Sequence, residues 1–269
     1  MYDTRYKGLL YNHGDFSMVD DLLAYEESLS ISINDMPFTI TMCTPGNEIE
    51  LVRGLLFSEG IYRDEHLHPE ITTVSKNVKG TVTAVNVHIP EEKLLKSFAG
   101  TRNIASVSSC GVCGKTALED DKTVLIENGK LDVLNVLSMF DKMSSAQDAF
   151  QQSGGTHAAG AFTLDGEILE MREDIGRHNA VDKVIGALLL SEKLHEAKCL
   201  TVSGRISYEI VSKVLSAGIP FLASVSAAST LAVENANAAG ITLMAFCRKN
   251  KLTVYTHTER ILQKDLVQK

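Results

Sequence analysis

Residues 199–225 read CLTVSGRISYEIVSKVLSAGIPFLASV, and this stretch decides the fold class of the chain. It begins with a short apolar run at 199–203 that is typical of a buried strand. An apolar face with helical spacing follows, formed by Ile210, Val211, Val214 and Leu215. Residues 220–225 read as the next strand. Strands that alternate with helices of this length favour a partly parallel sheet covered by helices.

The same alternation continues on both sides of this stretch. Downstream, an alanine-rich helix at 229–239 leads to two strands at 241–247 and 252–256. Upstream, the clearest helical stripe of the chain follows Gly176, at Val181, Val184, Ile185, Leu188 and Leu189. Each helix is therefore expected to lay one apolar face on the sheet.

Further upstream, the pattern weakens but keeps the same order of elements. A candidate helix at 144–152 precedes a strand at 157–164, and residues 167–171 can pair back through the turn at Asp165-Gly166. We therefore predict one α/β domain over residues 143–269.

The first third of the chain predicts a separate, smaller unit. Residues 29–33 and 38–42 alternate apolar and polar side chains around a turn, which indicates a hairpin. A helix is expected at 49–60 and another strand at 81–89. Residues 1–105 are thus predicted to form a small α+β domain.

Composition and charge exclude several classes of protein. The chain is 44% hydrophobic and 22% charged, which is typical of a globular protein. No apolar run approaches the roughly 18 residues that a membrane span needs, and the first residues lack the order of a signal peptide. A cytoplasmic protein is therefore expected. The net charge of −8 argues against nucleic acid as a partner.

Residues 106–142 are predicted to form a loop and a linking segment that contains a CxxC pair. Cys110 and Cys113 lie in SCGVCGK, where glycines give access and Lys115 favours a thiolate. Such a pair suits sulfur or redox chemistry. Structural zinc needs further ligands, for which His157 and His178 are the candidates. Two inert thiols, or a thioredoxin-like reductase, are the other interpretations.

Several polar turns are expected at one edge of the sheet. Arg177 and His178 follow a glycine where the strongest helix begins, and a helix N-terminus beside an arginine favours an anion. Arg205 follows the strand at 199–203, and Ser226 follows the next strand. Ligands gather where such strands end. Helix capping with a surface ion pair is the alternative for each turn taken alone.

The turn between the last two strands is strongly basic. It consists of Phe246, Cys247, Arg248, Lys249, Asn250 and Lys251. An aromatic ring can stack on a flat base while the basic side chains meet phosphates. A solvated charged hairpin is the commoner fate of such a run. Walker, GxSxG and GxGxxG motifs are missing from the sequence, which disfavours P-loop, serine-hydrolase and NAD chemistry.

Taken together, the motifs resemble one family. SSCGVCGK, GGTHAA, DIGRHNAVDKVIG, SGRISYE, SVSAASTLAV and FCRKNKLTVYTH are similar to the FdhD/NarQ family of formate dehydrogenase accessory sulfurtransferases. The resemblance implies that Cys110 carries a persulfide received from a cysteine desulfurase, with Cys113 as a helper. It implies transfer of that sulfur to the molybdenum or tungsten of a bis-pterin guanine dinucleotide cofactor for formate dehydrogenase. It places the cofactor-binding stretch at Phe246 to Lys251 and implies a homodimer. The polar turns at Arg177, His178 and Arg205 are expected to bind the phosphates of the same ligand.

The resemblance also implies a fold and leaves rival functions open. Residues 143–269 should resemble the cytidine deaminase fold, a mixed sheet with helices on both faces. Both zinc-binding elements of deaminases are missing, so no metal site is expected. The rivals are a chaperone that only escorts the pterin nucleotide and a dithiol oxidoreductase that cycles a Cys110–Cys113 disulfide.

Overall fold

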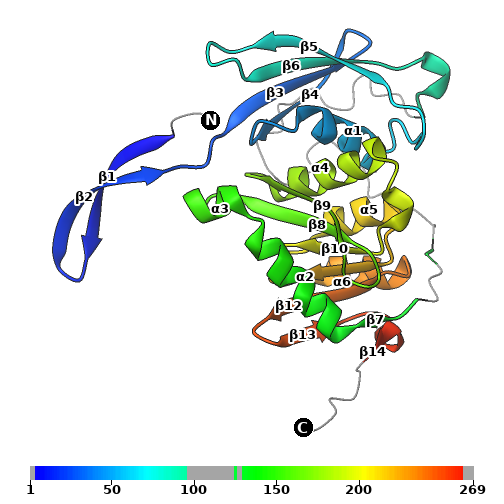
Figure 1. The fold of residues 1–269 in the computed structure, drawn as a ribbon. Coiled ribbons are helices and arrows are strands. Elements are labelled where there is room, and N and C mark those ends of the chain that lie inside the picture. The colour runs from blue at the N-terminus through cyan, green and yellow to red at the C-terminus, as the bar shows by residue number, and fades with distance from the viewer. Residues whose placement is uncertain (1–3, 96–123, 126–128, 263–269) are drawn as a thin grey trace.

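The computed structural model describes residues 4–95, 124–125 and 129–262. It consists of a body built on a large sheet, a smaller sheet stacked above it, and a two-stranded arm that projects to one side (Figure 1). The cysteine pair at Cys110 and Cys113 lies outside the described residues.

The large sheet has six strands among the described residues, in the order β13-β12-β11-β10-β8-β9. Their bounds are β8 His157–Phe162, β9 Ile168–Asp174, β10 Cys199–Val202, β11 Phe221–Ser224, β12 Thr242–Arg248 and β13 Lys251–Val254. Strands β10, β11 and β12 run parallel, whereas β8, β9 and β13 are antiparallel to the strands beside them. The partly parallel sheet predicted from the sequence is confirmed.

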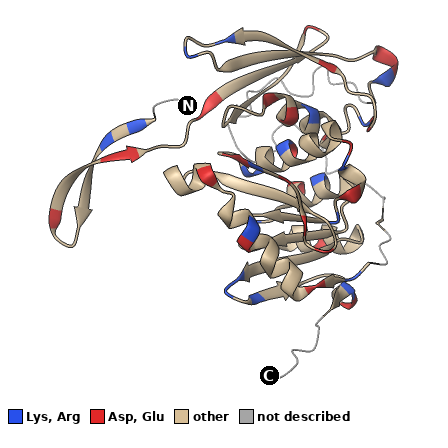
Figure 2. Cartoon of the chain, in the orientation of Figure 1, with Lys and Arg blue, Asp and Glu red and all other residues tan. Residues whose placement is uncertain are grey.

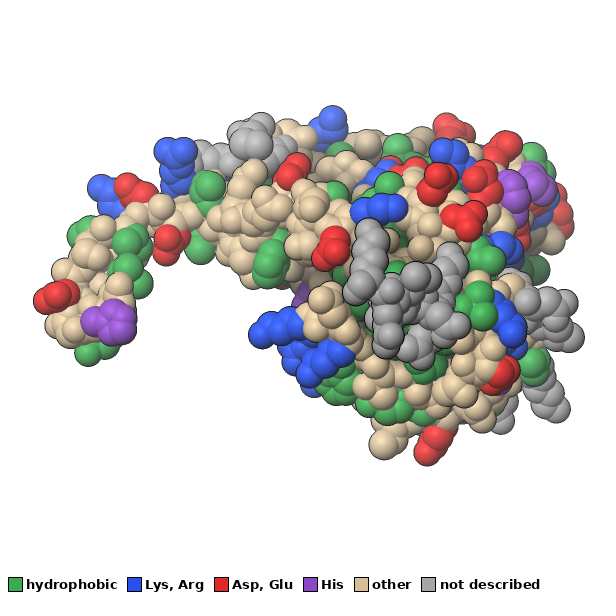
Figure 3. All heavy atoms as spheres, turned by 60° about the horizontal axis from the view of Figure 1, so that its bottom comes forward, with side chains coloured by type: hydrophobic (Ala, Val, Ile, Leu, Met, Phe, Trp, Pro, Cys, Tyr) green, Lys and Arg blue, Asp and Glu red, His purple; other side chains and the backbone are tan. Residues whose placement is uncertain are grey.

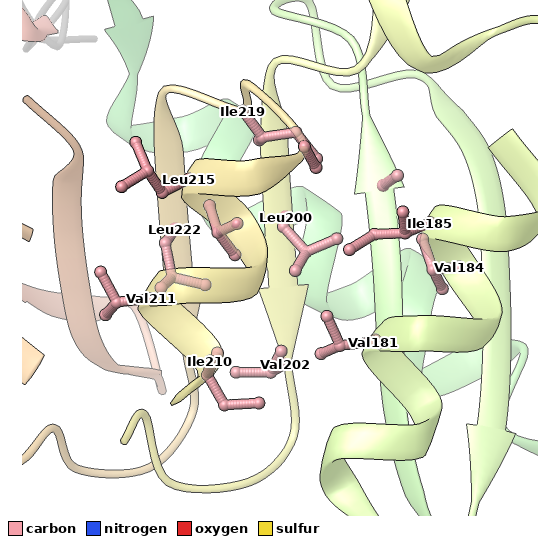
Figure 4. Close-up of a cluster of buried hydrophobic side chains, with 14 of the residues drawn as sticks. Val181, Val184, Ile185, Leu200, Val202, Ile210, Val211, Leu215, Ile219 and Leu222 are labelled. Carbon is pink, nitrogen blue, oxygen red and sulfur yellow. The ribbon is translucent and has the colours of Figure 1, made fainter. Parts of the chain in front are cut away.

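Helices cover both faces of this sheet. One face carries α4 (Arg177–Leu190), α5 (Tyr208–Ser216) and α6 (Thr230–Ala238). Figure 4 shows Val181 and Ile185 of α4 and Val211 of α5 pointing toward Leu200 and Leu222 of the strands. The other face is covered by α2 (Val133–Ser145), whose apolar side chains pack on Phe162, Phe221 and Met244. The mixed α/β architecture is therefore confirmed.

The helix predicted at 144–152 has the wrong bounds. The structure has α2 (Val133–Ser145) followed by the short α3 (Asp148–Ser153), so a helix lies inside the segment assigned to the linker. Asp132 caps α2 by accepting a hydrogen bond from Leu134 N at 2.8 Å. Its buried face is Val136, Met139, Phe140 and Met143, which has helical spacing. The helical spacing of these apolar residues is present in the sequence, but the charged residues around them obscured it.

The smaller unit has a four-stranded sheet among the described residues, in the order β4-β3-β6-β5, with α1 on one face. Its bounds are β3 Glu27–Ile33, β4 Met36–Cys43, α1 Glu48–Ser58, β5 Glu70–Lys76 and β6 Val82–His88. The hairpin, helix and strand predicted there are confirmed. Two-residue strands β7 (Leu131–Asp132) and β14 (Ile261–Leu262) pair with each other beside the body. Three 3-10 turns complete the described elements, at Glu91–Lys93, Leu194–Glu196 and Thr258–Arg260.

Helices α1 and α4 join the two units by direct backbone contact. A Cβ atom added to Gly54 would overlap the carbonyl oxygen of Asp182, and one added to Gly186 would overlap that of Glu50. The two glycines therefore face each other across the helix crossing, where side chains of any size are excluded. A buried ion pair lies beside the crossing, with Lys213 Nζ 2.8 Å from Asp182 Oδ1.

The arm was not predicted from the sequence. It is formed by β1 (Arg5–Asn12) and β2 (Asp15–Leu22), which pair only with each other among the described residues. No helix in the described part of the chain is long and apolar enough to cross a bilayer.

Candidate functional site

The polar turns expected at one edge of the sheet do lie at one edge. Strands β10, β11 and β12 are parallel and end there, as does β9, while the antiparallel β8 begins there with His157 opposite Asp174. We call this the carboxyl edge and define it by His157, Arg177, Arg205, Ser226 and residues 246–251.

Backbone and side-chain hydrogen bonds hold the loops of the carboxyl edge against one another. They run from Ser224 Oγ to Gly204 O (2.7 Å), from Ile206 N to Ala227 O (2.9 Å) and from Phe246 N to Ser226 O (3.0 Å). The turns after β10 and β11 and the end of β12 are therefore held together as one surface.

Gly204 lies in a closely packed part of the carboxyl edge. A Cβ atom on it would lie 3.3 Å from both Arg177 Cδ and His157 Nδ1. Ser203 Oγ lies 3.4 Å from the same His157 nitrogen. The Nε atom of Arg177 is buried and has no hydrogen-bond partner among the residues that the structure describes. A half-buried guanidinium with an unpaired donor is suited to bind an anionic oxygen.

His157, which the sequence singled out as a candidate zinc ligand, lies at the carboxyl edge beside Arg177. Burial, and then the charge of Arg177, lower the pKa of its imidazole below the usual value, so the ring is neutral near pH 7. The GGTH motif drew attention to this turn. Only the antiparallel pairing of β8 with β10, however, brings His157 beside Gly204.

His178 lies at the same edge but is largely buried. Its Nε2 atom is 3.3 Å from Ser207 Oγ and 3.8 Å from Glu209 Oε2, both at the start of α5. The ring therefore links the beginnings of α4 and α5 and presents only 7% of the residue's surface.

The basic segment at 246–251 comprises the end of β12, the turn at Lys249 and Asn250, and the start of β13. Phe246 has a positive φ of 56° at a β-bulge, and Lys249 and Asn250 have φ values of 53° and 57°. A bulge redirects side chains, and a bulky residue with positive φ is an outlier that often marks a functional site. Figure 2 shows this turn as a basic segment, and Figure 3 shows basic side chains gathered on the body on the side of the arm.

Cys247 points away from this exposed turn. It is fully buried among the residues beneath α2, and burial raises its pKa to about 12. The side chain therefore cannot reach a ligand at the turn in this structure, unlike the exposed Arg248, Lys249, Asn250 and Lys251.

Asp174 positions the start of α4. Its Oδ1 atom accepts hydrogen bonds from Gly176 N (2.8 Å) and Asn179 Nδ2 (3.0 Å). Its Oδ2 atom accepts one from Thr44 N (3.0 Å) and lies 2.7 Å from Lys183 Nζ. Because Asp174 and Lys183 are both almost fully buried, this pair fixes the turn that carries Arg177.

The described cysteines are poor nucleophiles. Cys43, Cys199 and Cys247 are all free and buried. Burial raises the pKa of each thiol, to about 12 for Cys43 and Cys247. They stay protonated at neutral pH, whereas sulfur chemistry needs an accessible thiolate. Among the described residues, no group of three or more His, Cys, Asp or Glu side chains could hold a metal ion.

Comparisons with known proteins point to one family. The model of the FdhD/NarQ family matches residues 24–262. A protein of Sulfolobus acidocaldarius named Sulfur carrier protein FdhD is 42% identical over 90% of this chain and 92% of its own length. Proteins of the same name from Mycobacterium tuberculosis and Streptomyces avermitilis are 41% and 39% identical, over 90% and 96% of this chain and 92% and 95% of their own.

A solved structure shows the same fold. The crystal structure of a candidate formate dehydrogenase accessory protein from Desulfotalea psychrophila superposes with a TM-score of 0.73. It covers 96% of this chain and 98% of its own, with 24% sequence identity. Fold, motifs and sequence identity agree, and this chain belongs to the FdhD/NarQ family.

Proposed function

We propose that this chain is a sulfurtransferase that carries persulfide sulfur on Cys110. The sulfur comes from a cysteine desulfurase and goes to the molybdenum or tungsten of a bis-pterin guanine dinucleotide cofactor, for use by formate dehydrogenase. One observation carries the proposal. Three of the five cysteines are buried with raised pKa values, which leaves Cys110 and Cys113 as the candidate carriers in a chain whose relatives are named sulfur carriers.

The first transfer needs no added oxidant or reductant. The Cys110 thiolate attacks the outer sulfur of the desulfurase persulfide, the S–S bond breaks, and the desulfurase cysteine leaves as a thiolate. In the second transfer the S–S bond breaks and Cys110 leaves as a thiolate, while the outer sulfur bonds to the metal of the cargo cofactor. That metal would have to arrive in its reduced state, because it supplies the two electrons that convert the sulfane sulfur to sulfide. Cys113 assists by stabilising or resolving the persulfide. We place this work in the cytoplasm.

The carboxyl edge would hold the nucleotide part of the cofactor. Arg177, with its unpaired Nε beside Gly204, is suited to a phosphate, and Arg205 is exposed nearby. Arg248, Lys249 and Lys251 add positive charge at the adjacent turn, where Phe246 can stack on a base. In a chain of net charge −8, this local basic surface would select an anionic ligand.

Persulfide formation tests the carrier. After incubation with a cysteine desulfurase and cysteine, mass spectrometry of the peptide that contains Cys110 should show one added sulfur atom. Cys110→Ala should abolish this adduct and the activation of formate dehydrogenase. The three buried thiols are protonated, and Cys113 only assists Cys110. Cys113→Ala should still load.

The control is Cys199→Ala, which removes a buried thiol and should load like the wild type. Full activation of the dehydrogenase by Cys110→Ala would refute the relay and favour the cofactor chaperone. Equal loss in both single variants, with a readily cycled disulfide, would instead favour the dithiol oxidoreductase.

Nucleotide binding tests the carboxyl edge. GDP should bind the full chain with an affinity that falls as salt is added, because exposed charges are screened. The double variant Arg248→Gln/Lys251→Gln should weaken binding by about tenfold or more, since two charge-assisted contacts are lost. Calorimetry measures this change. Lys76→Gln, on β5 of the smaller unit, is the matched control, and an equal loss there would show that the effect is non-specific.

The partners follow from this function. They are the desulfurase as sulfur donor, formate dehydrogenase as recipient and the guanine-bearing pterin cofactor as cargo. We also expect the working unit to be a homodimer.

A further inference from the structure

His157 lies at the carboxyl edge with one ring nitrogen held in place and the other open. Ser203 Oγ accepts a hydrogen bond from Ala158 N at 2.9 Å and lies 3.4 Å from His157 Nδ1, which can accept the hydroxyl proton. The neutral ring then carries its own proton on Nε2. Among the residues that the structure describes, Nε2 has no hydrogen-bond partner, and it is not a buried atom. The ring therefore has one N–H group that a ligand can use.

Arg177 provides a second donor beside this ring. A Cβ atom on Gly204 would lie 3.3 Å from both His157 Nδ1 and Arg177 Cδ, so the imidazole and the arginine stem flank the same glycine. Arg177 Cδ is bonded to Nε, which is buried and unpaired within the described part of the chain. The glycine keeps the space between the two side chains free. A neutral donor from β8 and a cationic donor from α4 thus converge where an anionic oxygen can be held.

The charges around His157 favour its neutral form before a ligand binds. Burial, and then the charge of Arg177, lower the pKa of the imidazole. Asp174, opposite His157 on β9, works against that shift, but a buried lysine on α4 lies 2.7 Å from its carboxylate. Glu173 bonds to the start of α3, and Arg205 is exposed. A bound phosphate would add negative charge beside the ring and so favour its protonated form.

We infer that His157 binds the pyrophosphate of the nucleotide together with Arg177 and takes up a proton from water when it does so. The added proton goes to Nδ1, and Ser203 Oγ, which has two lone pairs, then accepts a hydrogen bond from it. The protonated ring adds a positive charge beside the guanidinium. Because the bound form holds the proton more tightly than the free form, nucleotide binding strengthens as the pH falls and weakens as it rises. This inference rests on the nucleotide site of the proposed function and adds a proton-dependent residue to it.

Calorimetry with GDP-mannose tests the inference. The pyrophosphate of this guanine nucleotide is esterified at both ends, as in the proposed cofactor, so its charge does not change near neutral pH. The full chain should bind it about fivefold more tightly at about pH 6 than at about pH 8, because charge-assisted hydrogen bonds are the stronger ones. Titrations in buffers with different heats of ionisation should show net proton uptake. Both effects should be missing in His157→Gln, which keeps a donor but does not titrate.

Ser203→Ala separates the effect of the tautomer from a general loss of structure. Without the hydroxyl group, the neutral ring can carry its proton on either nitrogen, so binding should weaken at about pH 8. At about pH 6 both nitrogens of the bound ring carry a proton, and binding should match that of the wild type. Equal weakening at both pH values would contradict the tautomer on which the inference depends. His195→Gln, on an exposed turn, is the control and should keep the pH dependence of the wild type.

The outcomes distinguish this inference from the proposed function. Equal affinity of the wild type at both pH values, or unchanged proton uptake in His157→Gln, would overturn the role of His157 and leave the nucleotide site intact. A wild type that does not bind GDP-mannose at either pH would refute the nucleotide site and this inference with it. Persulfide loading of Cys110 is measured separately and depends on neither result.

Discussion

Gly54→Ala and Gly186→Ala should each lower the free energy of unfolding by about 3 kcal/mol or more. In an exposed helix the same substitution would stabilise by about 1 kcal/mol, because alanine has the higher helix propensity. Here the added methyl group would overlap the backbone of the opposing helix, at Asp182 or Glu50. The helices would have to separate, which would open the packing between the two units.

Urea denaturation followed by circular dichroism measures this effect, with Gly8→Ala as the control. A Cβ atom at Gly8 would meet Val19 at 3.5 Å, an ordinary contact, so its stability should change by less than about 0.5 kcal/mol. Stability of Gly54→Ala equal to that of the wild type would mean that the helices do not cross this closely. The double variant should fail to fold at 37 °C.

Asp174→Asn should cost about 3–5 kcal/mol of stability, because it leaves the charge of Lys183 buried without a counter-ion. The two side chains are 0% and 1% exposed and lie 2.7 Å apart. Asparagine keeps the shape of the side chain, so the loss reports on charge and hydrogen bonding rather than on a cavity. The start of α4 should also loosen, so GDP binding at the carboxyl edge should weaken in the protein that remains folded.

The matched control lies two residues earlier on the same strand. Arg172 pairs with Glu50 at 2.9 Å, but both side chains are more than 20% exposed. Arg172 keeps Glu170 as a partner at 2.8 Å and water can replace Glu50, so Glu50→Gln should cost about 1 kcal/mol or less. Equal losses in Asp174→Asn and Glu50→Gln would show that burial does not set the strength of these pairs.

Periodicity predicted the elements that bury one clear face. Val181 to Leu189 on α4 and the apolar run at 199–203 identified helix and strand because long-range packing agrees with the local pattern. The direction of the strands, not periodicity, placed Arg177 and Arg205 at one edge, because each residue follows the carboxyl end of a strand. The orientation of Cys247 could not be predicted, because the bulge at Phe246 changes the alternation of side chains.

The arm and the helix contact escaped prediction for different reasons. Residues 5–22 lack a buried face within their own chain, so no periodic signal separates them from a loop. Gly54 and Gly186 lie far apart in the sequence. An isolated glycine within a helical pattern usually indicates a less stable helix, and it gives no sign of a close contact with another helix. Both the arm and the helix crossing depend on contacts, present or missing, with segments that are distant in the sequence.

The order of strands has a consequence for the newly synthesised protein. His157 and Arg177 leave the ribosome well before Arg248 and Lys251, yet all four belong to the carboxyl edge. Translation proceeds at about 5–20 residues per second, so a nascent chain spends several seconds with the edge half built. Premature release during that interval would yield a polypeptide whose carboxyl edge lacks the basic segment at 246–251, and cells would gain from degrading such fragments.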